Sequence, residues 1–389
     1  MGPELLYVLT SPGIPVGGNS GASHHVTALV NAFAAEGQAV TLLAARQVEG
    51  PDPLPLARLV ELPTQKPPWW RRSRSQRERW QAQRFAQRAL EVVQGMKPRF
   101  IYERYALFSD VGHRLRPRLG CPWVLEVNAP LRLERSRYEG LRISRAVLRA
   151  EGEILRQADK VLAVSTPLAD WLTQEVGVPS SRVEVMWNGV DNTRFAPQTP
   201  DETLRLRLGL GDGPVVGFVG SLKPWHGLQN WVEVLARLAE RMPSVQGLVV
   251  GEGPERALME EVVTRQGLQH RVHFTGRRPG AEVPALLALM DVLLAPFPHQ
   301  ELFYFCPLKV LEAQAMGIPV VTTAQGDLPT LVGQGGAVVP PGDELALVEA
   351  LVAVLMDARV RARWREAGLM QSQGRDWRAV AQRILAKMA

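Results

Sequence analysis

The sequence ELFYFCPLKVLEAQAMGIPVV, residues 301–321, joins the start of a short helix to a buried strand. Pro307 suits the first position of a helix, apolar residues then recur at helical spacing, and Gly317 marks the end of the helix. The apolar segment PVVTT, residues 319–323, is typical of a strand that is buried in a parallel sheet. A helix followed at once by such a strand is the repeating pattern of an α/β fold.

Lys309 lies just inside the predicted start of this helix. The first backbone N–H groups of a helix have no acceptor inside it, and the helix dipole adds about half a positive charge there. A cation at this end becomes useful when an anion is bound, because helix N-termini bind phosphate. Two interpretations stay open: Lys309 and the helix start hold a phosphate group, or Lys309 is a solvated side chain that pairs with Glu312.

The composition indicates a globular protein of two or three domains. The chain has 389 residues, of which 46% are hydrophobic and 22% charged, and it is too long for one ordinary core. No apolar run reaches the length of a membrane-spanning helix, and the N-terminal segment is typical of a first strand rather than of a signal peptide. Two cysteines are too few for a disulfide framework or a cysteine zinc site. We therefore expect a cytoplasmic protein.

The basic charge lies in the N-terminal half of the chain. Residues 1–190 carry 25 Lys and Arg against 18 Asp and Glu, a surplus of 7, whereas residues 191–389 carry 20 against 21. This asymmetry indicates an anionic partner for the first half, either a membrane surface or an acidic substrate.

Apolar runs alternate with amphipathic helical patterns along the whole chain, which predicts parallel sheets covered by helices on both faces. The predicted strands are residues 4–10, 39–45, 99–103, 123–127, 160–165 and 182–187 in the first half, and 214–220, 247–251, 271–276, 291–296, 319–323 and 337–340 in the second.

We predict two doubly wound, Rossmann-like domains, residues 1–190 and 191–375, that face a central cleft. A polar segment with two prolines, residues 188–204, is typical of a hinge between them. Residues 376–389 are amphipathic, and we expect this C-terminal helix to pack back on the first domain. Ligands of open parallel sheets bind at the carboxyl ends of the strands, so the loops that follow the strands matter most.

Three of these loops have residues suited to a nucleotide. The glycine-rich loop SPGIPVGGNSGASHH, residues 11–25, would let backbone N–H groups approach a phosphate or sugar at Gly17 and Gly18, or it is only a flexible turn. GSLKPWHG, residues 220–227, places Lys223 and His226 directly after a strand. Lys223 could bind a diphosphate there; alternatively, it is a surface lysine and His226 only caps the turn. The backbone of TGRRP, residues 275–279, could contact the edge of a nucleobase; alternatively, this segment is only a polar loop.

These segments, with VSTPLADWL, VEVMWNGVDNTRFAP and LVVGEGPE, resemble in sequence and order the retaining group-one (family four) glycosyltransferases with the GT-B fold. The resemblance covers nearly the whole chain. It implies that the second domain binds a nucleotide-sugar donor, and that the first domain binds the acceptor.

The resemblance also implies the donor-site residues. Glu312 would bind the ribose hydroxyls, and Gly17 and Gly18 would cover the phosphates. Ser221 and His226 stand where the family has an Arg and a Lys, so Lys223 and Lys309 would supply the positive charge at the diphosphate. The remaining expected donor-site residues are Arg277, Pro307 and Leu308.

On the acceptor side, Asn128 stands where many relatives have a histidine. Asn128 could hydrogen-bond a hydroxyl of the donor sugar, and Glu126 or Glu103 could contact acceptor hydroxyls or stabilise positive charge. Alternatively, these acids pair with Arg104 or Arg132.

The implied reaction transfers a sugar to a hydroxyl of a glycan, glycolipid or small molecule, with retention at the anomeric carbon. The catalytic set would be Lys223, Lys309, Asn128 and Glu126. We expect no metal and no other cofactor, since no carboxylate cluster suggests a metal site. Two alternatives remain: a nucleotide-sugar epimerase or hydrolase on a similar scaffold, and a non-catalytic nucleotide- or glycan-binding relative.

Residues 66–93 combine eight basic residues with three tryptophans and a phenylalanine. Arg beside Trp at a helix start suits an anionic membrane surface, which would make the protein peripheral at the inner face of a membrane and favour a lipid-linked acceptor. The alternative is a solvated helix that packs on the first domain. We do not expect nucleic acid as a partner, because no recognised binding fold accompanies the charge.

Overall fold

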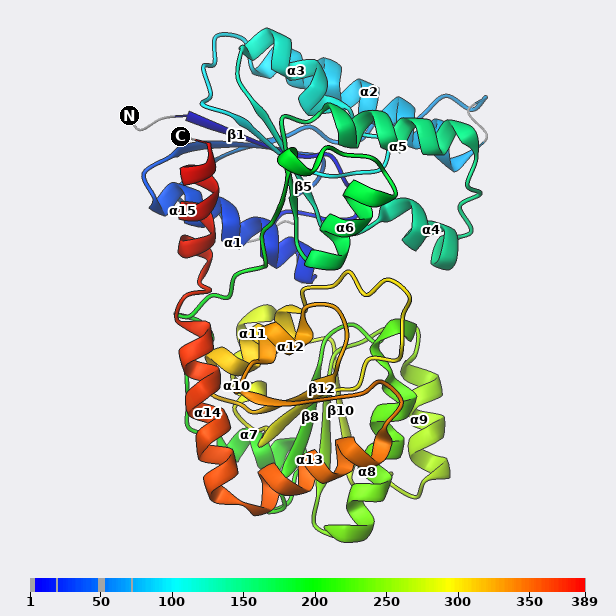
Figure 1. Ribbon diagram of the computed structural model, residues 1–389, viewed down its shortest axis with the longest axis vertical. Helices are drawn as coiled ribbons and strands as arrows, with labels where there is room; N and C mark the ends of the chain where they lie inside the picture. Colours follow the sequence, from blue (N-terminus) through cyan, green and yellow to red (C-terminus); the bar gives the residue numbers. More distant parts are fainter. Residues whose placement is uncertain (1–3, 19, 48–52, 71–72, 389) are drawn as a thin grey trace. The chain divides into compact units, whose positions relative to one another are not determined.

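The computed structural model describes residues 4–18, 20–47, 53–70 and 73–388, and its chain divides into two compact units (Figure 1). The first unit comprises Met1–Asn188, Tyr304–Cys306 and Trp377–Ala389, and the second comprises Gly189–Phe303 and Pro307–Asp376. Each unit contains one parallel sheet with helices on both faces. The predicted fold class, two Rossmann-like α/β domains, is therefore confirmed.

The first unit contains a seven-stranded sheet in the order β3-β2-β1-β4-β5-β6-β7, and all its neighbouring strands are parallel. The strands are β1 (Glu4–Leu9), β2 (Ala39–Ala44), β3 (Arg58–Glu61), β4 (Ile101–Arg104), β5 (Trp123–Val127), β6 (Lys160–Ala163) and β7 (Val183–Val185). The strand order reverses between β1 and β4, and such a reversal is where open α/β sheets bind ligands.

Two groups of helices cover this sheet. The helices are α1 (Gly21–Ala35), α2 (Arg74–Val92), α3 (Val111–Leu119), α4 (Leu131–Glu139), α5 (Arg145–Gln157), α6 (Thr166–Gln174), the short η1 (Ser180–Arg182) and α15 (Trp377–Lys387). Helix α15 lies beside α1, where Trp377, Val380 and Ile384 are buried (Figure 1). Helix α2 packs on α3. The amphipathic pattern of the C-terminal residues thus forms a helix of the first unit.

The second unit contains a six-stranded parallel sheet in the order β10-β9-β8-β11-β12-β13. Its strands are β8 (Val215–Val219), β9 (Gln246–Val250), β10 (Val272–Gly276), β11 (Val292–Ala295), β12 (Val320–Thr323) and β13 (Gly336–Val339). Its helices are α7 (Glu202–Arg207), η2 (Pro224–His226), α8 (Leu228–Arg241), α9 (Arg256–Arg265), η3 (Gly280–Glu282), α10 (Val283–Leu287), α11 (Leu308–Ala315), α12 (Leu328–Val332), α13 (Glu344–Met356) and α14 (Ala358–Ser372).

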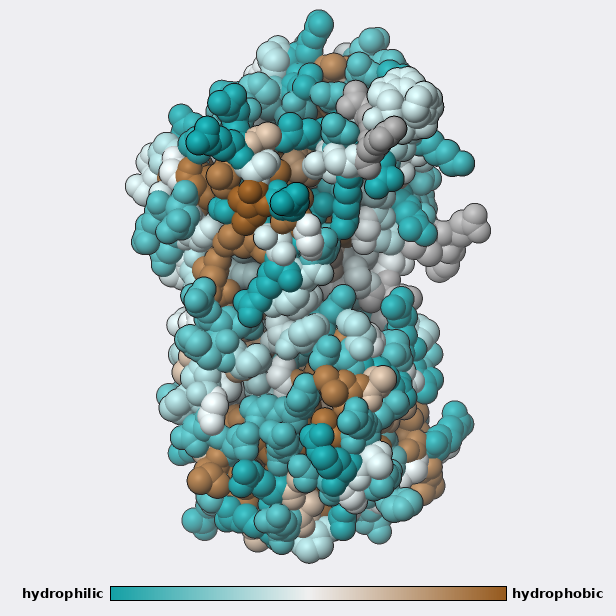
Figure 2. Space-filling view, turned by 90° about the vertical axis from the view of Figure 1, so that its right-hand side faces the viewer, coloured by the Kyte–Doolittle hydropathy of each residue, from teal (hydrophilic) through white to brown (hydrophobic). Residues whose placement is uncertain are grey.

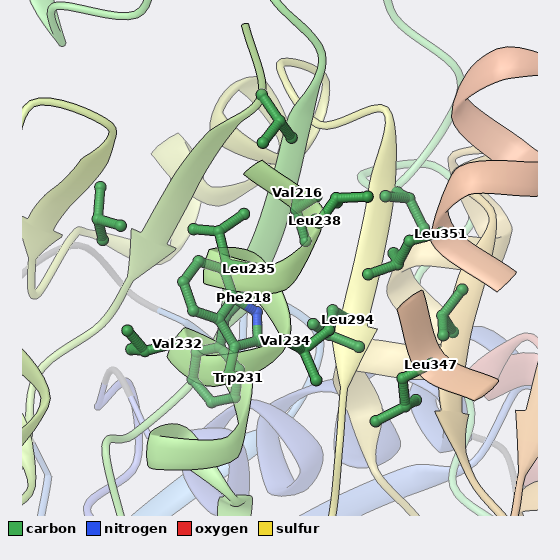
Figure 3. Close-up of a cluster of buried hydrophobic side chains, with 14 of the residues drawn as sticks. Val216, Phe218, Trp231, Val232, Val234, Leu235, Leu238, Leu294, Leu347 and Leu351 are labelled. Carbon is green, nitrogen blue, oxygen red and sulfur yellow. The ribbon is translucent and has the colours of Figure 1, made fainter. Parts of the chain in front are cut away.

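The core of the second unit lies between the sheet and helices α8 and α13. Phe218 of β8, Trp231 of α8 and Leu347 of α13 belong to one cluster of buried apolar side chains (Figure 3). Full burial of side chains of this size contributes about 1.5–3 kcal/mol each. This cluster fixes the position of β8, whose carboxyl end precedes the GSLKPWHG loop.

All twelve predicted strands are present, with ends that differ by at most two residues. The sequence did not predict β3, an edge strand that, among the described residues, pairs with β2 alone. Its sequence, RLVE, has charged residues at both ends and no fully buried side chain, so it lacks the apolar pattern of the other strands. Helix α11 begins at Leu308, and Pro307 is its N-cap rather than its first residue.

Three residues that precede α11 belong to the first unit. The hydroxyl of Ser165 donates to the backbone oxygen of Tyr304 at 2.8 Å, and the hydroxyl of Tyr304 donates to Glu134 at 3.0 Å. The side-chain amide of Asn188 donates to the backbone oxygen of Cys306 at 2.8 Å. The segment Tyr304–Cys306 is therefore held by hydrogen bonds to three residues of the first unit.

Candidate functional site

Lys309, the second residue of α11, is buried rather than solvated. Its side chain is 8% exposed, and its Nζ has no hydrogen-bond partner among the described residues. The Nζ lies 3.8 Å from the centre of the Phe218 ring and 5.8 Å from that of Phe297. The interpretation that Lys309 is a solvated partner of Glu312 is therefore wrong: the buried ammonium is left without an acceptor.

Burial lowers the pKa of Lys309 to about 7, although the nearby carboxylate of Glu312 opposes this effect. A buried ammonium without an acceptor is unfavourable, because the charge has lost its hydration and gained no hydrogen bond in its place. The contact with the Phe218 ring offsets part of the cost of burying this charge, because the face of an aromatic ring attracts a cation. An anion bound next to the Nζ of Lys309 would offset far more of this cost than the ring does.

Gly220 brings Lys309 close to the end of β8. This glycine has a φ of +133°, and a Cβ atom at its position would lie 3.2 Å from the Nζ of Lys309. The absence of a side chain thus leaves room for the ammonium next to the GSLKPWHG loop. The structure therefore brings together two of the predicted segments, α11 and the loop after β8, at the point where the strand order of the second sheet reverses.

His226 lies in the same group but carries no charge near neutral pH. Burial, and then the positive charge of Lys309, lowers its pKa to about 2. Its Nδ1 lies 2.6 Å from the backbone oxygen of Ser221, and this contact stabilises the turn. In the neutral form with the proton on Nδ1, the histidine has no proton on Nε2 to donate. His226 thus does not replace the family lysine as a cation in the free protein.

Lys223 is the second cation of this loop. Its side chain is half-buried, and its Nζ lies 5.7 Å from the centre of the Trp225 ring. The positive charge of Lys223, like that of Lys309, helps to lower the pKa of His226. Two lysines near one uncharged histidine make this end of the second sheet electropositive.

Glu312 lies one turn after Lys309 on α11 and is partly buried. Burial raises its pKa to about 7, while Arg194 and then Lys309 act in the opposite direction. Arg194 donates to the backbone oxygen of Gly280. The sequence offered no reason to single out Arg194, because its proximity to Glu312 depends on the packing of distant segments.

The other predicted donor residues lie in a loop or at the start of a helix. Arg277 is exposed after β10, and Pro307 and Leu308 form the start of α11. In the first unit, Gly17 has a φ of +77°, and the backbone N–H of Gly18 donates to the oxygen of Pro15 at 3.1 Å.

Glu126 and Asn128 form a second group, in the first unit at the end of β5. Glu126 is buried, and its carboxylate contacts Nε2 of His25 and lies 3.6 Å from Nη1 of Arg104. The side-chain amide of Asn128 donates to Glu126 at 2.9 Å. The pairing of Glu126 with Arg104, which the sequence left open, is thus present.

Glu103 does not share this group. Its carboxylate is fully buried and accepts hydrogen bonds from the Ser109 hydroxyl at 2.7 Å and from the backbone N–H of Gly112 at 2.8 Å. Burial raises its pKa to about 7 against these two hydrogen bonds. The expectation that Glu103 contacts an acceptor is therefore wrong for this conformation, since its carboxylate is inaccessible and joins β4 to α3.

Two family models match the chain: Glycosyltransferase Family 4 over residues 19–194, and Glycosyl transferases group 1 over residues 213–357. A GDP-mannose-dependent alpha-mannosyltransferase of Mycobacterium tuberculosis is 31% identical over 77% of this chain and 74% of its own length. The chain belongs to the group 1, family 4 glycosyltransferases.

Other members of this glycosyltransferase family match shorter stretches. A 2-deoxystreptamine glucosyltransferase of Streptomyces kanamyceticus is 35% identical over 58% of this chain and 57% of its own length. The chain spans a little over half the length of the first curated relatives that it matches.

Solved structures establish the GT-B fold of this family member. Sucrose-phosphate synthase from Thermosynechococcus elongatus superposes with a TM-score of 0.78 at 24% identity, covering 100% of this chain and 98% of that one. HepE of Anabaena, solved in complex with UDP and glucose, superposes with a TM-score of 0.76 at 22% identity, covering 99% and 98%.

Proposed function

We propose that this protein is a glycosyltransferase that moves a sugar from a nucleoside-diphosphate sugar to a hydroxyl group, with retention at the anomeric carbon. One observation carries the proposal: the buried ammonium of Lys309 has no acceptor among the described residues and lies at the start of α11. A diphosphate would supply the missing anion and also meet the free N–H groups of the helix start.

In this proposal Lys309 and Lys223 bind the diphosphate of the donor, and Glu312 binds the ribose hydroxyls. Ser221, His226, Arg277, Pro307 and Leu308 surround the nucleotide, and the loop with Gly17 and Gly18 covers the phosphates. Two relatives support a donor of this class: HepE was solved with UDP and glucose, and the mycobacterial mannosyltransferase is named as GDP-mannose-dependent.

The two lysines would also serve catalysis. As the glycosidic bond breaks, negative charge accumulates on the leaving diphosphate, where preorganised cations lower the barrier. We propose that a phosphate oxygen of the leaving group accepts the proton of the acceptor hydroxyl, so that no side chain has to act as the base. We further propose that the reaction needs no metal ion. Turnover that is insensitive to EDTA would support this part, and restoration of activity by Mg²⁺ or Mn²⁺ would contradict it.

The experiment that tests the donor site is isothermal titration of the protein with UDP, GDP and ADP, repeated with Lys309→Ala. We expect one nucleotide to bind and the variant to lose roughly tenfold or more in affinity, as for a charge-assisted hydrogen bond worth about 1.5–3 kcal/mol. The exposed Lys97→Ala is the matched control. Absence of binding for all three nucleotides would overturn the donor site.

Turnover separates the proposed reaction from its alternatives. A transferase consumes the nucleotide-sugar of the selected nucleotide faster when hydroxylated acceptors are added, and the sugar is found on the acceptor. Consumption at the same rate without any acceptor would indicate an epimerase or hydrolase. Nucleotide binding without consumption across an acceptor screen would indicate a non-catalytic relative.

We also propose that the first unit binds an anionic membrane surface at the inner face of the membrane, and that the acceptor is lipid-linked. The starts of α2 and α5 and the end of α4 are held side by side by three contacts. Arg74 pairs with Glu139 at 2.8 Å, Arg135 holds Glu78 through two bonds of 2.9 Å, and Arg79 donates to the backbone oxygen of residue 146 at 2.9 Å.

The surface formed by these elements, here called the basic apolar surface, combines exposed apolar side chains with exposed cations. Its apolar members are Trp69, Trp70, Tyr138, Ile143 and Leu148, five of the six exposed large hydrophobic residues that the structure describes in the first unit. Its exposed cations are Lys66, Arg74, Arg77, Arg137, Arg142, Arg145 and Arg149. Figure 2 colours one face of the protein by residue hydropathy, a scale on which tryptophan and tyrosine are pale rather than brown. Arg71 and Arg72 lie outside the described residues.

None of the helices that the structure describes is both long and apolar enough to cross a membrane. Exposed tryptophans suit the headgroup level, and each basic residue near an anionic surface contributes about 1 kcal/mol. Cosedimentation with vesicles tests this: we expect binding to mixed phosphatidylcholine and phosphatidylglycerol but not to phosphatidylcholine alone, and weaker binding at high salt.

The variant Trp69→Ala with Trp70→Ala should lose this binding, whereas Leu345→Ala with Met356→Ala removes two exposed apolar side chains of the second unit and should not. Failure of the wild-type protein to bind anionic vesicles would overturn the membrane proposal and leave the donor site untouched.

A further inference from the structure

The turn at residues 191–194 of the second unit holds an arginine in a fixed place. One carboxylate oxygen of Asp191 accepts hydrogen bonds from the hydroxyl of Thr193 at 2.7 Å, from the backbone N–H of Thr193 at 3.0 Å and from that of Arg194 at 3.1 Å. The side-chain amide of Asn192 donates to the backbone oxygen of Ser372, the last residue of α14, at 3.1 Å. The turn is therefore anchored at both its side chains and its backbone, and Arg194 extends from a defined backbone position.

The guanidinium of Arg194 is tied to the loop that follows β10. It donates to the backbone oxygen of Gly280, which comes directly after the TGRRP segment, and its Cζ lies 4.8 Å from the centre of the buried Phe195 ring. Its Nε is buried and has no hydrogen-bond partner among the described residues. A guanidinium has five N–H donors in a rigid fork, so a contact with one backbone oxygen leaves its positive charge and further donors for groups nearby.

Glu312 of α11 is the acid on which this charge acts. Burial raises the pKa of Glu312 to about 7, and the charge of Arg194, followed by that of Lys309, favours the ionised form against this effect. Helix α11 packs on α12, α14 and β12; from these elements, Asp327 stands at the N-cap of α12, and Arg365 of α14 lies past the end of α11. Arg194 therefore has the largest electrostatic effect on Glu312 among the residues that the structure describes.

The carboxylate of Glu312 is open to a ligand. It is partly exposed, and no hydrogen bond or ion pair to it is found within the described part of the chain. An ionised carboxylate can only accept hydrogen bonds, and a bond from a hydroxyl to a charged acceptor is about twice as strong as one to a neutral acceptor. The strength of a hydroxyl contact at Glu312 thus depends on the charge that Arg194 supplies.

We propose that Arg194 is a positioning residue of the donor site, which ties the turn at residues 191–194 to the loop after β10 and keeps Glu312 ready to accept hydrogen bonds from the ribose hydroxyls. This inference rests on the proposed nucleotide-sugar donor. It assigns the two residues different roles: Glu312 contacts the ribose, and Arg194 acts through Glu312. The preference for ribose over deoxyribose is then set jointly by two residues that lie far apart in the sequence.

The test measures the preference for a ribonucleotide over its 2′-deoxy form, with UDP, GDP and ADP and the 2′-deoxy form of each as probes. Both members of a pair carry the same diphosphate, so the ionisation of Lys309 and of the phosphates cancels in the ratio of their affinities. For the wild-type protein we expect a preference of roughly tenfold above about pH 8, which declines as the pH falls below about 7 and Glu312 takes up a proton.

Arg194→Gln should shift this pH dependence upward by about one pH unit, because Glu312 loses the larger of the two charges that favour its ionised form. At pH 7 the preference for the ribonucleotide should therefore be about two- to threefold smaller than in the wild type, and it should return at about pH 9. Arg194→Lys keeps a positive charge and should restore much of the preference at pH 7. Arg205→Gln is the matched control: Arg205 also donates to backbone oxygens of the second unit, those of Gly211 and Gly213, and its loss should leave the preference unchanged.

A purely structural role for Arg194 gives a different result. The ribonucleotide and its deoxy form would then lose affinity equally, with the pH dependence unchanged, and this outcome would overturn the inference. Arg194→Met, whose side chain can still pack on Phe195, is a second neutral variant that decides in the same way if Arg194→Gln does not fold. If the wild type binds a nucleotide but does not distinguish it from its deoxy form, this inference fails and the diphosphate site stands. If no nucleotide binds, the proposed function fails first.

Discussion

The Nζ of Lys309 lies 3.8 Å from the centre of the Phe218 ring, and no hydrogen-bond acceptor for it is found among the described residues. A charge in such surroundings lowers the stability of the free protein while it prepares a site for an anion. The two side chains come from α11 and β8, so the fold of the second unit holds the cation in place before any ligand arrives.

We expect Lys309→Met to stabilise the free protein and to weaken nucleotide-sugar binding roughly tenfold or more. Methionine fills a similar volume without a charge, and each unit of pKa change corresponds to about 1.4 kcal/mol, so a gain of a few kcal/mol in the free energy of unfolding is expected at neutral pH. Chemical denaturation measures the gain, and titration calorimetry measures the loss of binding. A destabilised variant would contradict the account of Lys309 as an unsatisfied buried charge.

Binding of a nucleotide-sugar should weaken as the pH rises above neutrality. The pKa of Lys309 in the free protein is about 7, and a bound diphosphate favours the charged form, so binding takes up a proton at higher pH. We expect the affinity to fall several-fold between about pH 6 and pH 9. A nucleotide-sugar is the right probe, because the terminal phosphate of a free nucleotide ionises in the same range. Lys309→Arg, which does not titrate, should reduce this dependence to what Glu312 contributes, whose pKa is also about 7.

Local patterns were sufficient to predict the fold but not the surroundings of the site residues. Twelve strands and the short helix α11 follow from apolar runs, a proline and a glycine that lie within a few residues of one another. The burial of Lys309 depends on Phe218, which is 91 positions away in the chain. The residues around Lys309 in the sequence therefore predict its charge and the helix start. They do not predict that its ammonium group is buried and loses its hydration.

The fold also distinguishes two carboxylates, Glu103 and Glu126, that the sequence treated as alternatives. Glu103 and Glu126 occupy successive parallel strands, and their sequence surroundings do not distinguish them. In the fold, Glu103 meets Ser109 and Gly112, while Glu126 meets His25 of α1. The roles of Lys223, Lys309, Asn128 and Glu126 in substrate binding stay predictions.

Glu103→Gln should stabilise the protein at mildly alkaline pH and have little effect in acid. The pKa of Glu103 is raised to about 7 in the folded state, above the value of about 4.3 in an unfolded chain. Its contribution to stability is therefore complete below about pH 4.3 and declines as the pH rises to about 7. Glutamine mimics the protonated form, so its advantage over the wild type should grow to the order of 2 kcal/mol at about pH 8.

Denaturation curves at several pH values measure this difference between the two proteins. The exposed Glu153→Gln is the control and should show no such trend. A constant difference at all pH values would mean that Glu103 is ionised in the fold under all these conditions, and would contradict the proposed titration.

Gly227→Ala should disrupt the loop that carries Lys223. Gly227 has a φ of +69°, and a Cβ atom at its position would lie 2.1 Å from the backbone oxygen of Pro296, so the backbone after β8 or after β11 would have to move. Gly267 is the matched control, because it has a φ of +70° and open space around the added atom. We expect Gly267→Ala to cost about 1 kcal/mol for the strained backbone alone, and Gly227→Ala to cost at least 2 kcal/mol more. Denaturation measures both costs, and equal costs would show that the approach of Gly227 to Pro296 is not what fixes the loop.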